Sequence, residues 1–305
     1  MSTVLPTARS GLLANLAAGT SSPLGATPGP DGVNFSVYSS RATGVELLLF
    51  AHANDSSAAR VIRINPATNR TYHYWHVFVP GVSAGQIYGY RVEGPRDPAR
   101  GMLFDPTKIL LDPYGRAVGV PDNYRRTAAS EAGDNGATAM KSIVVDTTTY
   151  DWEGDTPLRL PSARTIIYET HVRGFTQHPS SEIAEEKRGT FAGLIEKVPY
   201  LRQLGITAVE LLPVFQFDAQ ACPPGKVNYW GYQPISFFAP APSVQFSSGP
   251  ARVGGRVPRH GQSTTLRWHR GDPRCCIQSY CRGRPYRANT VFPRVRQSDL
   301  LHPRR

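Results

Sequence analysis

The chain has 305 residues, which is room for about two domains, and no stretch of it is apolar for long enough to span a bilayer. Its formal net charge of +11 is unevenly placed. Residues 243–305 hold 13 of the 34 Lys and Arg, all of them Arg, but only two of the 23 Asp and Glu. The excess of positive charge therefore lies in this last part, and residues 1–242 have the balance of an ordinary globular protein.

The N-terminal residues and the cysteines indicate the setting of the protein. Residues 1–20 carry one Arg and a patchy Leu/Ala stretch, which is a poor secretory signal, and we expect a disordered leader there. Cys222 is the only cysteine before Pro242, so no disulfide framework is indicated. A reducing, cytoplasmic localisation fits this cysteine usage.

Short strands with turn residues between them fill residues 21–115. Val33, Phe35 and Val37 alternate with polar residues, and residues 45–49 form a returning strand after a turn at 39–44. Period-two alternation predicts strands with one face buried. Further short strands are expected at 60–64, 75–79 and 88–93, and this spacing is typical of a β-sandwich. Residues 116–163 are predicted to be a loop-rich connecting segment.

The pattern changes at Arg164 to that of an α/β unit. Residues 165–169 predict a short apolar strand, and residues 191–204 carry apolar side chains at helical spacing. Pro199 suits a first helical turn, and Gly205 follows the helix end. Residues 206–213 form a nearly continuous apolar strand, which is typical of a parallel sheet covered by helices. Strand, helix and strand together predict a βαβ unit in residues 164–242.

At this point several short motifs, in order along the chain, resemble a known family. They are 32–38 (GVNFSVY), 75–81 (WHVFVPG), 88–95 (YGYRVEGP), 105–108 (DPTK), 167–176 (IYETHVRGFT), 205–213 (GITAVELLP) and 228–232 (NYWGY). The ordered set resembles isoamylase-type debranching enzymes of glycoside hydrolase family 13, the α-amylase superfamily, over residues 23–240. The resemblance implies a family 48 carbohydrate-binding β-sandwich at 21–115, immunoglobulin-like in its fold. It implies the first strands and helix of a (β/α)8 barrel at 164–242.

The same resemblance implies an activity and a partner. Such enzymes cleave α-1,6-glucosidic branch linkages with retention, so the expected partner is a branched α-glucan such as glycogen or amylopectin. No cofactor is expected, since no phosphate-binding Gly loop is present, and Cys275, Cys276 and Cys281 lack the paired spacing of a zinc site. Neither a membrane nor a nucleic acid is an expected partner.

The catalytic carboxylates are not assigned to any residue of this chain. Retaining cleavage requires a nucleophile and a general acid about 5–5.5 Å apart. The resemblance implies that these groups lie at the ends of later barrel strands, beyond the part of the chain that resembles the family. Glu169, Glu210 and Asp218 occur in the barrel part, but the family pattern gives none of them a catalytic role. We therefore expect this chain by itself to be inactive.

Tyr232 and Trp230 are the predicted substrate-binding residues. The resemblance implies that Tyr232 lies at the floor of the subsite holding the reacting sugar, where an aromatic ring can stack on a pyranose. The alternative for Tyr232 is a packing role in an aromatic cluster, and a buried Trp230 would equally be structural. His171, at the end of a predicted strand, could face the same cleft or serve as a structural histidine.

Residues 243–305 admit two interpretations. One is an Arg-rich disordered segment that contacts an acidic partner. The other is translation in the wrong frame: a one-base shift of residues 268–280 permits GIEVILDVVFNH, a buried strand ending in the D-x-x-x-N-H signature of the superfamily. Codon degeneracy permits this reading without forcing it. We hypothesise a one-base slip between Phe238 and Ser243, which the DNA sequence across that junction would test.

Three hypotheses of function follow. The first is the N-terminal part of a debranching glycoside hydrolase. The second is a non-catalytic glucan-binding protein that acts through the sandwich. The third, which has the least support, is a nucleic-acid binder that acts through the basic tail.

Overall fold

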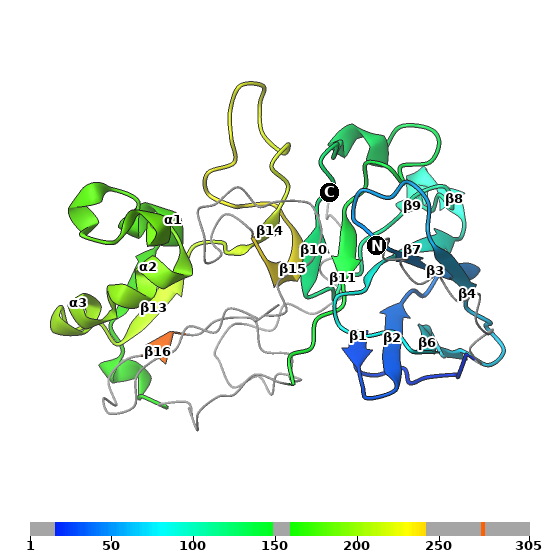
Figure 1. Ribbon diagram of the computed structural model, residues 1–305, viewed down its shortest axis with the longest axis horizontal. Coiled ribbons are helices and arrows are strands. Elements are labelled where there is room, and N and C mark those ends of the chain that lie inside the picture. The colour runs from blue at the N-terminus through cyan, green and yellow to red at the C-terminus, as the bar shows by residue number, and fades with distance from the viewer. Residues whose placement is uncertain (1–15, 149–158, 242–275, 278–305) are drawn as a thin grey trace, which may run out of the picture.

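The computed structural model describes residues 16–148, 159–241 and 276–277. Figure 1 shows a β-rich part at one end of the molecule and a smaller α/β part at the other, with a two-stranded sheet between them. The expected leader and tail, with the hypothesised frame shift, fall largely on residues outside these ranges. Among the residues described, no helix is long and apolar enough to cross a membrane.

The first sheet has four antiparallel strands in the spatial order β1-β2-β6-β5. Its strands are β1 (Gly25–Pro28), β2 (Gly32–Tyr38), β5 (Arg70–Thr71) and β6 (Tyr74–Pro80). The long central pair places Val33 opposite Val79 and Phe35 opposite Val77. This register puts the alternating apolar residues of both strands on one face of the sheet.

The second sheet has five antiparallel strands in the order β10-β11-β7-β3-β4. Its strands are β3 (Gly44–Phe50), β4 (Arg60–Arg63), β7 (Ile87–Glu93), β10 (Ala117–Gly119) and β11 (Lys141–Ile143). A separate small pair is formed by β8 (Arg96–Asp97) and β9 (Met102–Leu103). Because β10 and β11 come from the expected connecting segment, the sheet continues beyond residue 115.

A single apolar core joins the two sheets. Its buried side chains are mainly β-branched, leucine and aromatic: Val33, Phe35, Leu47, Trp75, Val77, Tyr88 and Tyr90. The rings of Phe35 in the first sheet and Tyr88 in the second meet edge to face, with centroids 5.0 Å apart. The sandwich prediction is thus confirmed. The strands β2 and β3 do not pair with each other, because the turn between them carries the chain from one sheet to the other.

The outer face of β2 is also covered, although the sequence predicted only one buried face. Ser36 donates to the carbonyl of Ser21, and the amide of Asn34 exchanges hydrogen bonds with the backbone of Thr20. The preceding segment therefore lies against this face. Polar residues in alternation here are satisfied by backbone groups and not by solvent.

Two buried lysines organise the segment between β9 and β11. The ammonium of Lys141 donates to the carbonyls of Ala53, Gly136 and Ala139, and it lies 4.9 Å from the centroid of the Phe50 ring. Lys108 bonds three other carbonyls in the same way, those of residues 128, 131 and 133. Each ammonium replaces lost water contacts with three carbonyl acceptors, and these bonds hold the loop between β10 and β11 in place.

The α/β part begins with β12 (Ile167–Thr170), which pairs in parallel with β13 (Ala208–Leu211). Between them lie α1 (Val172–Thr176), α2 (Phe191–Glu196) and α3 (Val198–Gln203). The βαβ prediction is confirmed, but the single helix expected over 191–204 is wrong. The helix is interrupted at Lys197, because Pro199 in the first turn of α3 has no N–H to continue the preceding helix. Gly205 follows with φ of 87°, as expected after a helix end.

The helices cover one face of the β12–β13 sheet. Leu201, Ile206 and Val209 form a buried cluster there, with Tyr168 and Phe175 packed against it. On the described strands the opposite face carries Ile167, which is 60% exposed, and the exposed Glu169 and Glu210. Burial of both strand faces, expected from the apolar sequence 206–213, is therefore not found among the residues described.

The strands β14 (Phe215–Phe217) and β15 (Pro234–Pro240) form the antiparallel pair that connects the two parts. On the sandwich side, the Ser236 hydroxyl donates to the Gly115 carbonyl, and the rings of Tyr114 and Phe238 stack with centroids 5.2 Å apart. In the tail, β16 (Cys276–Ile277) pairs in parallel with β13.

Candidate functional site

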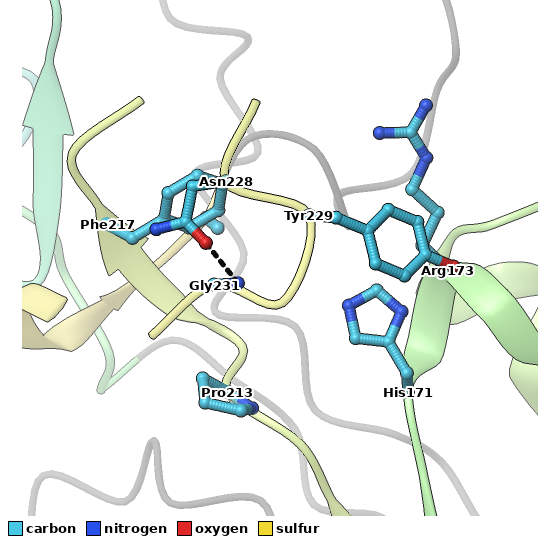
Figure 2. A pocket seen from close by; sticks show the side chains of 8 residues that line it. His171, Arg173, Pro213, Phe217, Asn228, Tyr229 and Gly231 are labelled. Atoms are coloured by element: carbon cyan, nitrogen blue, oxygen red, sulfur yellow. Dashed lines mark hydrogen bonds between the residues drawn. The ribbon is translucent and has the colours of Figure 1, made fainter. Parts of the chain in front are cut away.

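The residues around the candidate site come from the end of β12 and from the turn at 228–232, which face each other in Figure 2. His171 follows β12 directly and is the N-cap of α1, where its Nδ1 accepts a hydrogen bond of 3.0 Å from the Gly174 amide. An accepting Nδ1 carries no proton, so the neutral ring holds its proton on Nε2. The helix start thereby fixes the orientation of the imidazole.

His171 is held in its neutral form by its surroundings. Burial is the main cause that lowers the pKa of His171 below its usual value of 6.5, while a hydrogen bond with the backbone of Tyr229 raises the pKa and the charge of Arg173 lowers it. The Tyr229 ring stacks on the imidazole, with centroids 4.7 Å apart and an interplanar angle of 26°. The pair therefore forms an uncharged aromatic platform.

The turn that carries Tyr229 is closed by Asn228. The Asn228 side chain donates to the Tyr232 carbonyl at 2.8 Å. It also accepts from the Gly231 backbone amide at 3.0 Å, the bond drawn in Figure 2. Gly231 has φ of 75°, and a Cβ at this position would lie 2.9 Å from the Pro213 carbonyl oxygen. Only glycine fits this close approach in a left-handed conformation, so the turn has one geometry.

Eight residues line a small hollow of about 30 Å³ beside the platform: His171, Arg173, Pro213, Phe217, Asn228, Tyr229, Gly231 and Ala241. This volume is enough for a water molecule but not for a sugar ring. Any ligand larger than a few atoms would therefore have to lie outside the hollow, against the exposed aromatic surface.

The two predicted substrate-binding residues lie next to this hollow but do not line it. Trp230 is 54% exposed, and its ring lies 5.6 Å from Tyr229 and 5.8 Å from His171, edge to face in both cases. Tyr232 is also 54% exposed and contributes its backbone carbonyl to the turn. Tyr229, which lines the hollow and is 42% exposed, was not singled out from the sequence, although it lies in the same motif. A packing role for Trp230 and Tyr232 does not suit their exposure.

The three carboxylates considered from the sequence do not meet at the hollow. Glu169 and Glu210 stand opposite each other in the β12–β13 register, and both are exposed. Asp218 is 3% exposed and pairs with Tyr124 and Arg126 of the connecting segment. Within the described ranges, no group of three or more His, Cys, Asp or Glu is placed to hold a metal ion.

Comparison with known proteins assigns the sandwich. The family model of carbohydrate-binding module 48, the isoamylase N-terminal domain, matches residues 23–115. Residues 23–115 are thus similar to the isoamylase N-terminal domain. The strands β1 to β9 fall inside the matched range, whereas β10 and β11 extend the second sheet beyond it.

The likeness to isoamylases continues past the module. The chain is 40% identical over 245 residues to isoamylase 1, chloroplastic, of Oryza sativa subsp. japonica, a match of 78% of this chain and 30% of that protein. It is 44% identical over 238 residues to the glycogen debranching enzyme of Serratia proteamaculans, a match of 75% of this chain and 35% of that protein. The predicted relationship to isoamylase-type debranching enzymes is confirmed, and the chain spans about a third of the length of these relatives.

Solved pullulanase structures share the fold. The pullulanase of Anoxybacillus sp. LM18-11, complexed with maltotetraose, is 26% identical with a TM-score of 0.52, covering 72% of this chain and 29% of that one. The apo pullulanase of Paenibacillus barengoltzii is 24% identical with a TM-score of 0.56, covering 74% of this chain and 33% of that one.

Proposed function

We propose that the chain is the sugar-binding N-terminal part of a glycoside hydrolase that cleaves α-1,6 branch linkages in glycogen or amylopectin-like glucans with retention. The observation that carries the proposal is the aromatic platform of His171 and Tyr229, with the exposed Trp230 ring edge-on beside it, held by the turn at 228–232. The names of the matched relatives, isoamylase and glycogen debranching enzyme, support the same reaction.

The platform has the chemistry that a glucan requires. One face of a glucopyranose ring presents C–H groups, and the negative face of an aromatic ring attracts their positive edge. A neutral imidazole and a phenol ring bear no charge that would need hydration, so a sugar can displace water from them at small cost. The Asn228 and Arg173 side chains at the rim of the hollow can supply hydrogen bonds to sugar hydroxyls.

Catalysis requires groups that the hollow does not have. No carboxylate is among the residues that line it, and the pair Glu169 and Glu210 lies along the strands instead. We propose that the nucleophile and the general acid belong to the part of the relatives that this chain does not span. The chain alone is expected to bind branched glucan without hydrolysing it.

Affinity electrophoresis tests the proposal. Migration of the 305-residue chain in a native gel should be slowed when glycogen is included. Replacing Tyr229 and Trp230 with Ala should restore the mobility, because both stacking surfaces are lost. The matched control is Phe237→Ala, which removes another exposed ring, 60% exposed on β15 and outside the hollow. Equal mobility of the unaltered chain with and without glycogen would reject the proposal.

Glucan binding through the sandwich alone is the second candidate, and an exposed aromatic group favours it. Tyr38 is 49% exposed and meets Tyr74 with ring centroids 5.3 Å apart, and Tyr72 nearby is 77% exposed. Trp75 of β6, by contrast, is fully buried in the core and is not available to a sugar. Glycogen retardation that is lost on Tyr38→Ala and kept when both Tyr229 and Trp230 are Ala would identify the sandwich as the binding part.

For the basic tail we propose the one-base slip in place of a functional basic segment. The matches to the first two relatives cover 75–78% of the chain, and the proposal is supported by the part of the chain that they leave unmatched. DNA across codons 238–243 that requires no correction, with stop codons soon after in the shifted frame, would contradict this proposal.

A further inference from the structure

Asp218 is a buried carboxylate that the proposed sugar chemistry does not use. It follows β14 directly and is 3% exposed. Its Oδ2 accepts hydrogen bonds from the Tyr124 hydroxyl at 2.9 Å and from Nη1 of Arg126 at 2.8 Å. Its Oδ1 accepts a hydrogen bond of 2.9 Å from the backbone N–H of Gln220. Both side-chain donors belong to the connecting segment, more than 90 residues earlier in the chain.

Gln220 makes a second connection to the same segment. Its side-chain oxygen accepts from the Arg126 amide at 2.8 Å, and its side-chain nitrogen donates to the Tyr124 carbonyl at 2.8 Å. The side chains of Asp218 and Gln220 thus make four hydrogen bonds with Tyr124 and Arg126. We call these four residues, Tyr124, Arg126, Asp218 and Gln220, the clamp.

The clamp is joined to the aromatic turn by direct packing. Phe217 precedes Asp218, and a Cβ built on Gly231 would lie 3.4 Å from Cδ1 of the Phe217 ring. Phe217, Asn228 and Gly231 all line the hollow, and Figure 2 shows the hydrogen bond between Asn228 and Gly231. A displacement of β14 at Asp218 therefore acts on the turn through Phe217 and Gly231.

A simple surface ion pair does not account for these contacts. Exposed pairs contribute little to stability, since both charges stay hydrated. Here the carboxylate is buried while Arg126 is half exposed, so loss of either donor leaves a desolvated oxygen without its full set of partners. Burial also raises the pKa of Tyr124, and the bond to Asp218 adds to this, so the hydroxyl keeps the proton that it donates.

We infer that Asp218 is a positioning residue for the aromatic turn at 228–232, acting through the clamp that ties β14 to the connecting segment. The positioning role itself is tested by hydrogen exchange. Only the expected effect on maltotetraose binding rests on the proposed function. The connecting segment that follows the carbohydrate-binding module is then a part of the glucan site, although none of its residues lines the hollow.

Hydrogen exchange of the full 305-residue chain tests the positioning directly. Asp218→Asn keeps the shape of the side chain and removes its charge, and Tyr124→Phe removes one donor without touching β14. In both variants, exchange of residues 221–232 should rise by about tenfold, the equivalent of one charge-assisted hydrogen bond, while residues 191–204 keep their rate. The double variant should exchange no faster than Asp218→Asn alone, because both act through one contact.

The matched control is Asp134→Asn. This change removes a carboxylate of the same connecting segment whose partners are Arg91 of β7 and the Gly136 backbone amide, and not the residues of the clamp. It should leave the exchange of 221–232 unaltered. Unchanged exchange of 221–232 in both Asp218→Asn and Tyr124→Phe would overturn the inference, as would an equal rise over the whole chain. If Asp218→Asn does not fold, Tyr124→Phe decides alone.

Maltotetraose binding by the same variants separates the inference from the proposed function. Weaker binding by about tenfold in Asp218→Asn, with wild-type binding in Asp134→Asn, supports both. A local rise in exchange with no maltotetraose binding by the unaltered chain keeps the positioning role and rejects the glucan site. Unaltered binding in a variant whose turn exchanges faster would overturn the claim that the position of the turn matters to the sugar.

Discussion

Asp112 gives the sharpest prediction about the junction between the sandwich and the α/β part. It is 1% exposed, and its two oxygens accept hydrogen bonds of 2.8 Å from the Tyr88 hydroxyl and from the Tyr114 amide. Burial raises the pKa of Asp112 from its usual 3.8 to about 6, although these hydrogen bonds and the charge of Arg116 act in the opposite direction. We consider replacement by Asn, which has the same shape and does not titrate.

The sign of the effect follows from the two pKa values. Because the folded value is higher than the unfolded one, the native state binds more protons between pH 3.8 and 6. The contribution of Asp112 to the free energy of unfolding is therefore full below pH 3.8 and is lost as the pH rises through 6. The difference between the two values corresponds to about 3 kcal/mol, since one pKa unit is about 1.4 kcal/mol.

Urea unfolding at pH 4.5 and pH 7.5 measures this contribution. The unaltered chain should lose about 2 kcal/mol of its free energy of unfolding between pH 4.5 and pH 7.5 through Asp112, and Asp112→Asn should not show this loss. The stability of the variant relative to the unaltered chain should therefore rise by about 2 kcal/mol over this range. Asp105→Asn is the control without a pH effect in this range, because hydrogen bonds from Thr107 lower the pKa of Asp105 and place its titration below pH 4.5. A difference between Asp112→Asn and the unaltered chain that does not depend on pH would refute the reasoning.

Three further changes have expected outcomes. Gly231→Ala should lower the free energy of unfolding, measured in urea, by about 2 kcal/mol, and it should abolish retardation in glycogen gels. The reason is that φ is positive at this position and the added Cβ would meet the Pro213 carbonyl. A variant that is still fully retarded would show that the turn tolerates a side chain. Lys141→Met should lower the free energy of unfolding by about 3 kcal/mol in the same urea assay, since three carbonyls lose their donor. A decrease of less than about 1 kcal/mol would show that water replaces the ammonium. Glu210→Gln should raise the melting temperature slightly, by the equivalent of about 0.5 kcal/mol, because it stands beside Glu169 in the sheet; an effect that does not shrink in high salt would exclude charge repulsion as the cause.

Local patterns predicted the strands and the parallel unit well, since each depends on residues close together in the sequence. The alternation at Val33, Phe35 and Val37 gives β2, and Gly205 ends α3 as expected. The break at Lys197 was missed, although Pro199 was recognised as a residue of a first turn. Two short helices that meet at one residue differ from a single helix only in the backbone conformation of that residue. The spacing of apolar side chains does not predict such a local break.

Long-range contacts explain what the sequence did not predict. The buried outer face of β2 depends on Thr20 and Ser21, and the place of Asp218 depends on Tyr124, 94 residues away. Neither contact leaves a periodic signal. Tyr229 was overlooked for a different reason: the motif at 228–232 contains three aromatic residues, and only the packing of His171 shows which ring lines the hollow.

Saturation-transfer NMR of maltotetraose with the 305-residue chain tests the central claim most directly. The account predicts transfer to the C–H protons of the glucose rings, and loss of most of this transfer when Tyr229 and Trp230 are replaced by Ala. Absence of transfer from the unaltered chain, or full transfer after the two aromatic rings are removed, would contradict the aromatic platform as the glucan site.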